Sequence, residues 1–114
     1  MEDCLFCKII AGKMETEFIY QDEELVVFKD ISPQAPVHLL IVPKKHIANL
    51  NQLNKRDNNL VGQIYQVAQK MAAKYDIDQS GYRVVSNCGQ DGGQTVNHIH
   101  FHLLGGRELQ WPPG

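Results

Sequence analysis

Three histidines at every second position, in the run His98-Ile99-His100-Phe101-His102-Leu103-Leu104, restrict the fold of this chain more than any other feature. Alternation of polar and apolar residues is typical of a β-strand, whose successive side chains point to opposite faces. The run therefore predicts a strand that buries Ile99, Phe101 and Leu103 while three imidazoles share its other face. An ordinary solvated face would rarely use histidine three times, because neighbouring imidazoles repel one another once protonated.

Three imidazoles on one face suit two kinds of chemistry. Same-face neighbours on a strand lie about 7 Å apart, and two such rings can converge on one metal ion, as in a zinc hydrolase. Alternatively, one neutral ring nitrogen is a nucleophile, and its neighbours orient it and handle the proton of the leaving group. The alternation alone leaves both possibilities open.

The composition predicts one ordinary globular domain over residues 1–114, with 43% hydrophobic and 21% charged residues. A net charge of −2 supplies no basic field, so we expect no binding to nucleic acid, whereas nucleotides remain possible small ligands. No segment has the pattern of a secretion signal or the length of a membrane span. We therefore expect a cytoplasmic protein without a membrane partner.

The predicted fold class is α+β, an antiparallel sheet of about five strands with one long helix and a short N-terminal helix. Apolar spacing predicts helices over 4–11 and 57–75, and strands over 18–21, 25–29, 37–43, 82–87 and the histidine run. We expect Asp3 to cap the first helix. The glycine-rich segment 88–94 predicts a loop whose N–H groups can converge on an anion, with further donors from Gln94 and Thr95.

Two cysteines and two histidines outside the run are also candidates for a site. Cys4 and Cys7, at i and i+3, share one face of the predicted helix. They are either small buried residues or half of a zinc site, because three cysteines do not suggest a disulfide framework. His38 lies in an apolar strand and needs a polar partner, and His46 follows that strand in a turn.

The histidine run resembles the motif of the histidine triad superfamily, His-φ-His-φ-His-φ-φ, where φ is apolar. Segment 30–36 with His38, and segment 42–46, resemble a second signature region of that superfamily. The segments 92–95 and 111–114 resemble the Hint branch, the histidine triad nucleotide-binding proteins. The fragile-histidine-triad branch lacks this tail, and the uridylyltransferase branch has Gln in place of the third histidine.

The resemblance implies a homodimer with purine nucleoside phosphoramidase activity on adenosine 5′-phosphoramidates and acyl adenylates. By position, His100 is the nucleophile that attacks the α-phosphorus and forms a nucleotidyl-histidine, which water hydrolyses without a catalytic cofactor. His38 and His102 would hold phosphate oxygens and the leaving group, and Thr95 would help the departing amine take its proton. The implied nucleotide-binding residues are Asp30, Ile31, Asn87, Gly93, Gln94, Thr95, His100 and His102.

Two departures from the common Hint pattern are informative. Many Hint proteins have Ser where this chain has Thr95, and many lack the pair formed by Cys4 and Cys7. Bacterial members that carry the pair look like a subgroup in which Cys4, Cys7, His46 and His98 bind a structural Zn²⁺. Four such ligands leave no open position, so that zinc would not be catalytic.

Two alternatives to the phosphoramidase remain. The first is a zinc-dependent hydrolase that uses His98, His100 and His102, or His38, as direct ligands. The second is a nucleotide-binding regulatory module with incidental slow hydrolysis. The tail also predicts a dimer contact, because a Trp at position 111 beyond the last strand usually packs on something.

Overall fold

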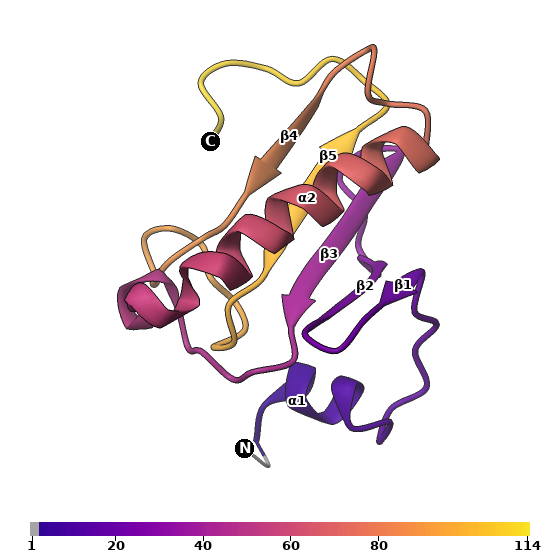
Figure 1. Cartoon of the computed structure of the whole chain (residues 1–114). Coiled ribbons are helices and arrows are strands. Elements are labelled where there is room, and N and C mark those ends of the chain that lie inside the picture. Colours follow the sequence, from indigo (N-terminus) through magenta and orange to yellow (C-terminus); the bar gives the residue numbers. More distant parts are fainter. Residues whose placement is uncertain (1–2) are drawn as a thin grey trace.

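The computed structural model describes residues 3–114 and shows an antiparallel sheet of five strands with helices packed against it (Figure 1). The sheet order is β1-β2-β3-β5-β4, which confirms the predicted α+β class. No helix in residues 3–114 has the length and apolar character needed to cross a membrane. The elements are α1 (Leu5–Ile10), β1 (Tyr20–Gln21), β2 (Leu25–Lys29), β3 (Val37–Pro43), α2 (Asn58–Lys74), β4 (Tyr82–Val85) and β5 (Phe101–Gly105), with two 3-10 helices at Leu50–Gln52 and Lys55–Asp57.

Strand β3 is the centre of the sheet and sets the position of the histidines. It pairs with β5 in a register that places His38 opposite Leu104 and Leu40 opposite His102. Directly opposite residues share a face, so the side chains of His38 and His102 lie on the same face of neighbouring strands.

The two faces of the sheet belong to two separate cores. Helix α2 runs along one face, over β5 and β3 (Figure 1), and packs on Leu39, Ile41 and Leu103. Helix α1 covers part of the other face, near the end of β3, where Phe6 and Ile9 pack against side chains of β2 and β3. Those strand residues are Val26, Phe28, Leu40 and Val42. Strands β2 and β3 are therefore buried on both faces, which explains why their sequences are continuously apolar rather than alternating.

The long helix matches its prediction to within one residue at each end. Its N-cap, Asp57, is buried and accepts hydrogen bonds from Nζ of Lys45 at 2.8 Å and from the backbone N–H of Asn54 at 3.1 Å. These two bonds, with that from Lys45 the stronger influence, lower the pKa of the Asp57 carboxyl. A cap fixed in this way connects the turn after β3 to the start of α2.

Four predicted boundaries were wrong, and two of them have a clear local reason. The cap of α1 is Cys4 rather than Asp3, because Sγ of Cys4 accepts from the backbone N–H of Cys7 at 3.3 Å. Strands β1 and β4 are shorter than their apolar runs. Strand β5 begins only at Phe101, because the backbone N–H of Ile99 donates to the carbonyl of Ile47, beyond the end of β3, at 2.6 Å.

Candidate active site and metal centre

The histidine run does not form a solvated polar face. His98 is 0% exposed and His100 is 5% exposed, while His102 is half-buried. The rings of His102 and His100 have centroids 5.2 Å apart, and those of His102 and His38 are 5.1 Å apart. The ring of His98 instead lies 4.9 Å from that of His46. The five histidines therefore divide into a catalytic candidate group of three and a second group of two.

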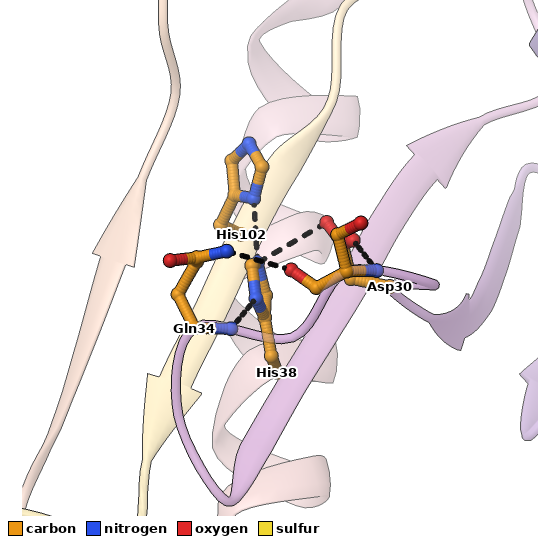
Figure 2. Close-up of polar contacts among 5 residues, drawn as sticks. Asp30, Gln34, His38 and His102 are labelled. Atoms are coloured by element: carbon orange, nitrogen blue, oxygen red, sulfur yellow. Dashed lines mark hydrogen bonds and ion pairs between the residues drawn. The ribbon is translucent and has the colours of Figure 1, made fainter.

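A chain of hydrogen bonds runs through His38 to His102 (Figure 2). The backbone N–H of Gln34 donates to Nδ1 of His38 at 3.0 Å, and Nε2 of His38 lies 2.9 Å from Nδ1 of His102. A carboxylate oxygen of Asp30 lies 3.4 Å from the same Nε2. Because the Gln34 amide can only donate, we assign the proton of His38 to Nε2, where it is donated to His102. Nδ1 of His102 is then the acceptor, and its own proton lies on Nε2.

Burial keeps the two rings of this chain neutral. Desolvation lowers the pKa of His38, although the nearby Asp30 carboxylate opposes the change. Desolvation, followed by the charges of His100 and His38, lowers the pKa of His102 to about 4. At neutral pH, His102 therefore presents one N–H donor and carries no charge.

The ring of His100 is oriented by the main chain. Its Nδ1 lies 2.8 Å from the carbonyl oxygen of His98, which can only accept, so Nδ1 carries a proton. In the neutral ring the lone pair is then on Nε2. The carbonyl of His100 in turn accepts from the hydroxyl of Ser86 at 3.1 Å. His100 has the tautomer that a nucleophilic imidazole requires.

The loop between β2 and β3 supports the first histidine of this group. Asp30 accepts from the backbone N–H of Ser32 at 2.8 Å, and the Gln34 side chain donates to the Ser32 carbonyl at 3.0 Å. Asp30 and His38 line a small cavity of about 160 Å³. Ile31, at the tip of the loop, is 99% exposed. A fully exposed aliphatic side chain at the tip of a loop is suited to contact with a flat apolar ligand group.

The second group contains the four predicted metal ligands, which the structure brings together. Cys4, Cys7, His46 and His98 offer ligand atoms that all lie within 4.8 Å of one another. The Sγ–Nδ1 distances are 3.3 Å and 3.5 Å from His98 to the two cysteines and 3.4 Å from His46 to Cys7, and the two Nδ1 atoms are 3.1 Å apart. These four residues can therefore hold a metal ion.

The distances agree with the donor set that zinc prefers. Tetrahedral zinc with Zn–N near 2.0–2.1 Å and Zn–S near 2.3 Å requires about 3.3 Å between nitrogens and about 3.6 Å between nitrogen and sulfur. The observed separations are within a few tenths of an ångström of these edges. Nε2 of His98 lies 2.8 Å from the carbonyl of Pro43, which fixes the tautomer with Nδ1 directed at the cluster.

Comparison with known proteins shows the family of the chain. A family model described as "Scavenger mRNA decapping enzyme C-term binding" matches residues 3–110. An uncharacterised HIT-like protein of Synechococcus elongatus is 45% identical over 99% of this chain and 98% of its own length. The chain belongs to the histidine triad (HIT) superfamily. The similarity covers the whole HIT domain and not the histidine motif alone.

Solved structures of HIT proteins share the fold closely. A HIT family hydrolase from Legionella pneumophila has 49% identity and a TM-score of 0.96, with 98% of this chain and 100% of that chain covered. A HIT family hydrolase from Clostridium thermocellum has 44% identity and a TM-score of 0.93, with 96% of each chain covered. A histidine triad nucleotide-binding protein from Candida albicans has 32% identity and a TM-score of 0.82, with 96% of this chain and 83% of that chain covered.

The glycine-rich loop of this HIT domain is held by hydrogen bonds within itself. The N–H of Gly89 donates to Oε1 of Gln94 at 2.9 Å, that of Gly93 to the Gln90 carbonyl at 3.0 Å, and that of Gln94 to the Gly89 carbonyl at 3.0 Å. In this conformation these three N–H groups donate within the loop. A Cβ at Gly92 would lie 2.5 Å from the Cys88 carbonyl oxygen, so the tight turn requires glycine there.

The side chain of Gln94 holds this loop against the turn after β3. Its Nε2 donates to the carbonyl of Ala48 at 2.7 Å and to that of Val96 at 3.0 Å. Both amide hydrogens are thereby used within the protein. Gln94 is consequently placed to position the loop, and its side chain has no hydrogen left for a phosphate in this conformation.

The remaining predicted residues lie on the two sides of the loop. Asn87 is half-buried just beyond β4, and Thr95 is exposed immediately before the histidine run. Thr95 lines an open cavity of about 560 Å³ that also borders Cys4 and His46. The hydroxyl of Thr95 is therefore accessible from the side of the metal cluster.

The sequence did not predict two residues, Arg107 and Phe6, that support the candidate histidines. The Arg107 guanidinium donates to the carbonyl of Gln34, and Phe6 lies with its ring edge-on to His98 and His100. No spacing signal identifies Arg107 or Gln34. The sequence did contain a signal for Phe6. It lies between Cys4 and Cys7, so a site formed by those two cysteines brings its buried side chain close to the histidines.

Proposed function

We propose that this HIT protein is a nucleotide hydrolase, a purine nucleoside phosphoramidase that cleaves adenosine 5′-phosphoramidates or acyl adenylates as a cytoplasmic homodimer. The observation that carries the proposal is the bond from Nδ1 of His100 to the His98 carbonyl, which leaves Nε2 free as a nucleophile beside the neutral ring of His102. Similar solved structures described as HIT family hydrolases and as a nucleotide-binding protein support the same class.

In the first step, Nε2 of His100 attacks the α-phosphorus, a nitrogen–phosphorus bond forms, and the bond to the leaving amine breaks. The amine departs with a proton delivered through the Thr95 hydroxyl and replaced there from solvent. In the second step, water attacks phosphorus, the bond to His100 breaks and AMP is released. Overall, one water molecule supplies the oxygen of AMP and the proton of the amine.

The neutral, hydrogen-bonded pair of His38 and His102 stabilises negative charge on the phosphate. Nε2–H of His102 donates to a phosphate oxygen, and its direction is set by His38 through the bond to Nδ1. In this assignment Asp30 accepts from the ribose hydroxyls, and Ile31 packs on the base. By resemblance, Asn87, Gly93 and Gln94 lie at the phosphate and the scissile bond.

A His100→Ala variant tests the mechanism. We expect turnover to be lost while nucleotide binding persists, because the ring is the nucleophile and the binding contacts lie elsewhere. Acid quenching of the wild type during turnover is expected to trap one AMP on His100, visible as a mass increase on the peptide that contains it. Near-normal hydrolysis by His100→Ala would remove the proposal.

A metal-dependent hydrolase remains a second candidate, because Asp30, His38 and His102 offer ligand atoms within 4.8 Å of one another. The version that uses His98, His100 and His102 together is not supported, since Nδ1 of His98 faces the cysteines. Asp30, His38 and His102 would hold such a metal, which would supply activation of water, and this chemistry would not need the His100 ring. Activity retained in His100→Ala and lost in Asp30→Asn would therefore favour the metal enzyme.

A regulatory nucleotide-binding module is distinguished by turnover against a panel of substrates. If no phosphoramidate or acyl adenylate is hydrolysed above the uncatalysed rate, while AMP binds, the chain is a binding module.

We further propose that the ion of the Cys4, Cys7, His46 and His98 cluster is Zn²⁺, which would link α1 to the sheet and stabilise the fold.

A further inference from the structure

Phe6 contacts a histidine of each group, His98 and His100. It lies in α1, between the cap residue Cys4 and Cys7, and is 4% exposed. Its ring centroid is 5.0 Å from that of His100, with an interplanar angle of 86°, and 5.9 Å from that of His98, with an angle of 74°. These are edge-to-face contacts, the arrangement that aromatic rings favour.

His98 couples the two groups a second time, through its backbone. Its Nδ1 faces the cysteines, its Nε2 bonds to the Pro43 carbonyl, and its own carbonyl accepts from Nδ1 of His100. Both ring nitrogens are thus restrained at the residue whose carbonyl orients the His100 ring. Movement of His98 would change the direction of that carbonyl.

Helix α1 cannot hold this arrangement by itself. It has six residues, too few for a helix to be stable without tertiary contacts. Its position depends on the packing of Phe6 and Ile9 and on the contacts of Cys4 and Cys7 with His46 and His98. Loss of the contacts of Cys4 and Cys7 would therefore also allow Phe6 to move.

We propose that α1 and the metal cluster position the nucleophile, with Phe6 as the positioning residue that restrains the ring of His100. This inference rests on the proposed function, in which His100 is the nucleophile. A bound metal ion would hold Cys4, Cys7 and His98 together, so that Phe6 closes on one side of the His100 ring while the His98 carbonyl fixes its Nδ1. The nucleoside contacts proposed for Asp30 and Ile31 lie in a different loop and do not depend on α1.

Two phenylalanines of one core give a matched pair for the test. Phe28 is 5% exposed, belongs to the same hydrophobic cluster as Phe6 and lies 5.7 Å from it. Among residues 3–114, the aromatic partners of Phe28 are Phe6 and Phe18, with no histidine. Phe6→Leu and Phe28→Leu therefore remove similar packing, but only Phe6→Leu removes the contact with His100.

We expect Phe6→Leu to lower kcat about tenfold with KM for the nucleotide unchanged, because a misplaced nucleophile slows the chemical step without weakening binding. Phe28→Leu is expected to keep kcat within about twofold of the wild type at a similar loss of thermal stability. Equal effects of the two substitutions on kcat would overturn the proposal.

A second measurement does not depend on turnover. Nitrogen-15 NMR of the zinc-loaded wild type is expected to show one tautomer for His100, protonated at Nδ1. Phe6→Leu, and wild type stripped of zinc by chelation, are expected to show averaging of the two tautomers, whereas Phe28→Leu keeps one. Identical His100 signals with and without zinc would also overturn the proposal. If His100→Ala still hydrolyses substrate, the proposed function fails, and the NMR comparison separately decides whether α1 restrains the ring.

Discussion

Nε and Nη2 of Arg107 lie 3.2 Å and 2.9 Å from the carbonyl oxygen of Gln34, so the segment after β5 holds the loop before β3. The backbone N–H of the same Gln34 donates to Nδ1 of His38. One residue thus connects an exposed arginine to the hydrogen bonds that set the tautomer of His102. Arg107 does not touch the histidines and acts on them only through the loop.

We predict that Arg107→Ala lowers kcat about threefold to tenfold, because loss of a charged donor to Gln34 loosens the amide that orients His38. The measurement is steady-state kinetics with an adenosine phosphoramidate. Arg83→Ala is the matched control, since Nη2 of Arg83 also donates to a backbone carbonyl, that of Gln110, at 3.0 Å, but away from the loop. Equal kinetic losses in both variants would contradict this role for Arg107.

The lowered pKa of His102 makes a prediction about acid stability. The value is about 4 in the folded protein against 6.5 for an ordinary histidine. Below pH 6.5 the unfolded chain binds a proton at this ring that the folded chain does not, so the free energy of unfolding falls as the pH falls from 6.5 to 4. After a discount for the partial exposure of the ring, the loss is on the order of 2 kcal/mol.

Urea denaturation at pH 7 and pH 4.5, with wild type and His102→Gln, measures this contribution. We expect the wild type to lose more stability on acidification than the variant does. Both proteins keep the metal cluster, so its own acid sensitivity cancels in the comparison. The same pH dependence in both would show that His102 titrates normally.

The metal site predicts about one equivalent of zinc per chain in protein purified without added metal. A Cys4→Ser and Cys7→Ser double variant is expected to lose the metal and to hydrolyse substrate at a reduced kcat. With free zinc at 100 times its Kd, the wild type gains about 3 kcal/mol of stability over the metal-free form.

Cys88→Ser is the control for the metal prediction, because Cys88 is a half-buried cysteine outside the cluster. It should keep the metal and the stability. Metal-free wild type whose thermal unfolding does not change when zinc is added would leave Cys4 and Cys7 as ordinary buried residues.

Dimerisation is predicted from the edge of the sheet and the tail. In the described residues, β4 has one neighbour, β5, and its other edge is open. Trp111, beside that strand, is 80% exposed. We expect sedimentation to show a dimer at micromolar concentration, weakened by Trp111→Ala but not by Leu50→Ala, which removes another exposed apolar side chain. A monomeric wild type would contradict the prediction.

The hydrophobic periodicity of the sequence was sufficient to predict the sheet, the long helix and the apolar faces that they pack together. The alternation around Phe101 and Leu103 gave the correct inward residues, because a strand buried on one face has to follow a period of two. The same rule correctly placed His98 and His100 on the opposite face, but it did not predict their burial. Their rings point away from the α2 core but are covered by α1, and this second layer depends on a six-residue helix that has little periodicity of its own.

Contacts made by the backbone were beyond the reach of the sequence. The cap of α1 by Cys4, the folding of Gln94 onto its own loop and the contact of Arg107 with Gln34 all depend on where carbonyls and N–H groups point. Every residue has those groups, so residue type carries no signal for them. The four candidate metal ligands were different, because the spacing of Cys4 and Cys7 suggested half of a site and the resemblance to the family implied His46 and His98.

The sheet also separates the long helix α2 from the candidate catalytic histidines. Helix α2 packs on the face opposite His38 and His102, and its Gly62 is exposed, with nothing within 4 Å of an added Cβ. Gly62→Ala is expected to stabilise the protein by about 0.5–1 kcal/mol, since alanine loses less backbone entropy in a helix. Substitutions on distant sites generally add independently, so kcat and KM should not change. The long helix is thus a place where thermal tolerance can be increased without retuning the chemistry on the other side of the sheet.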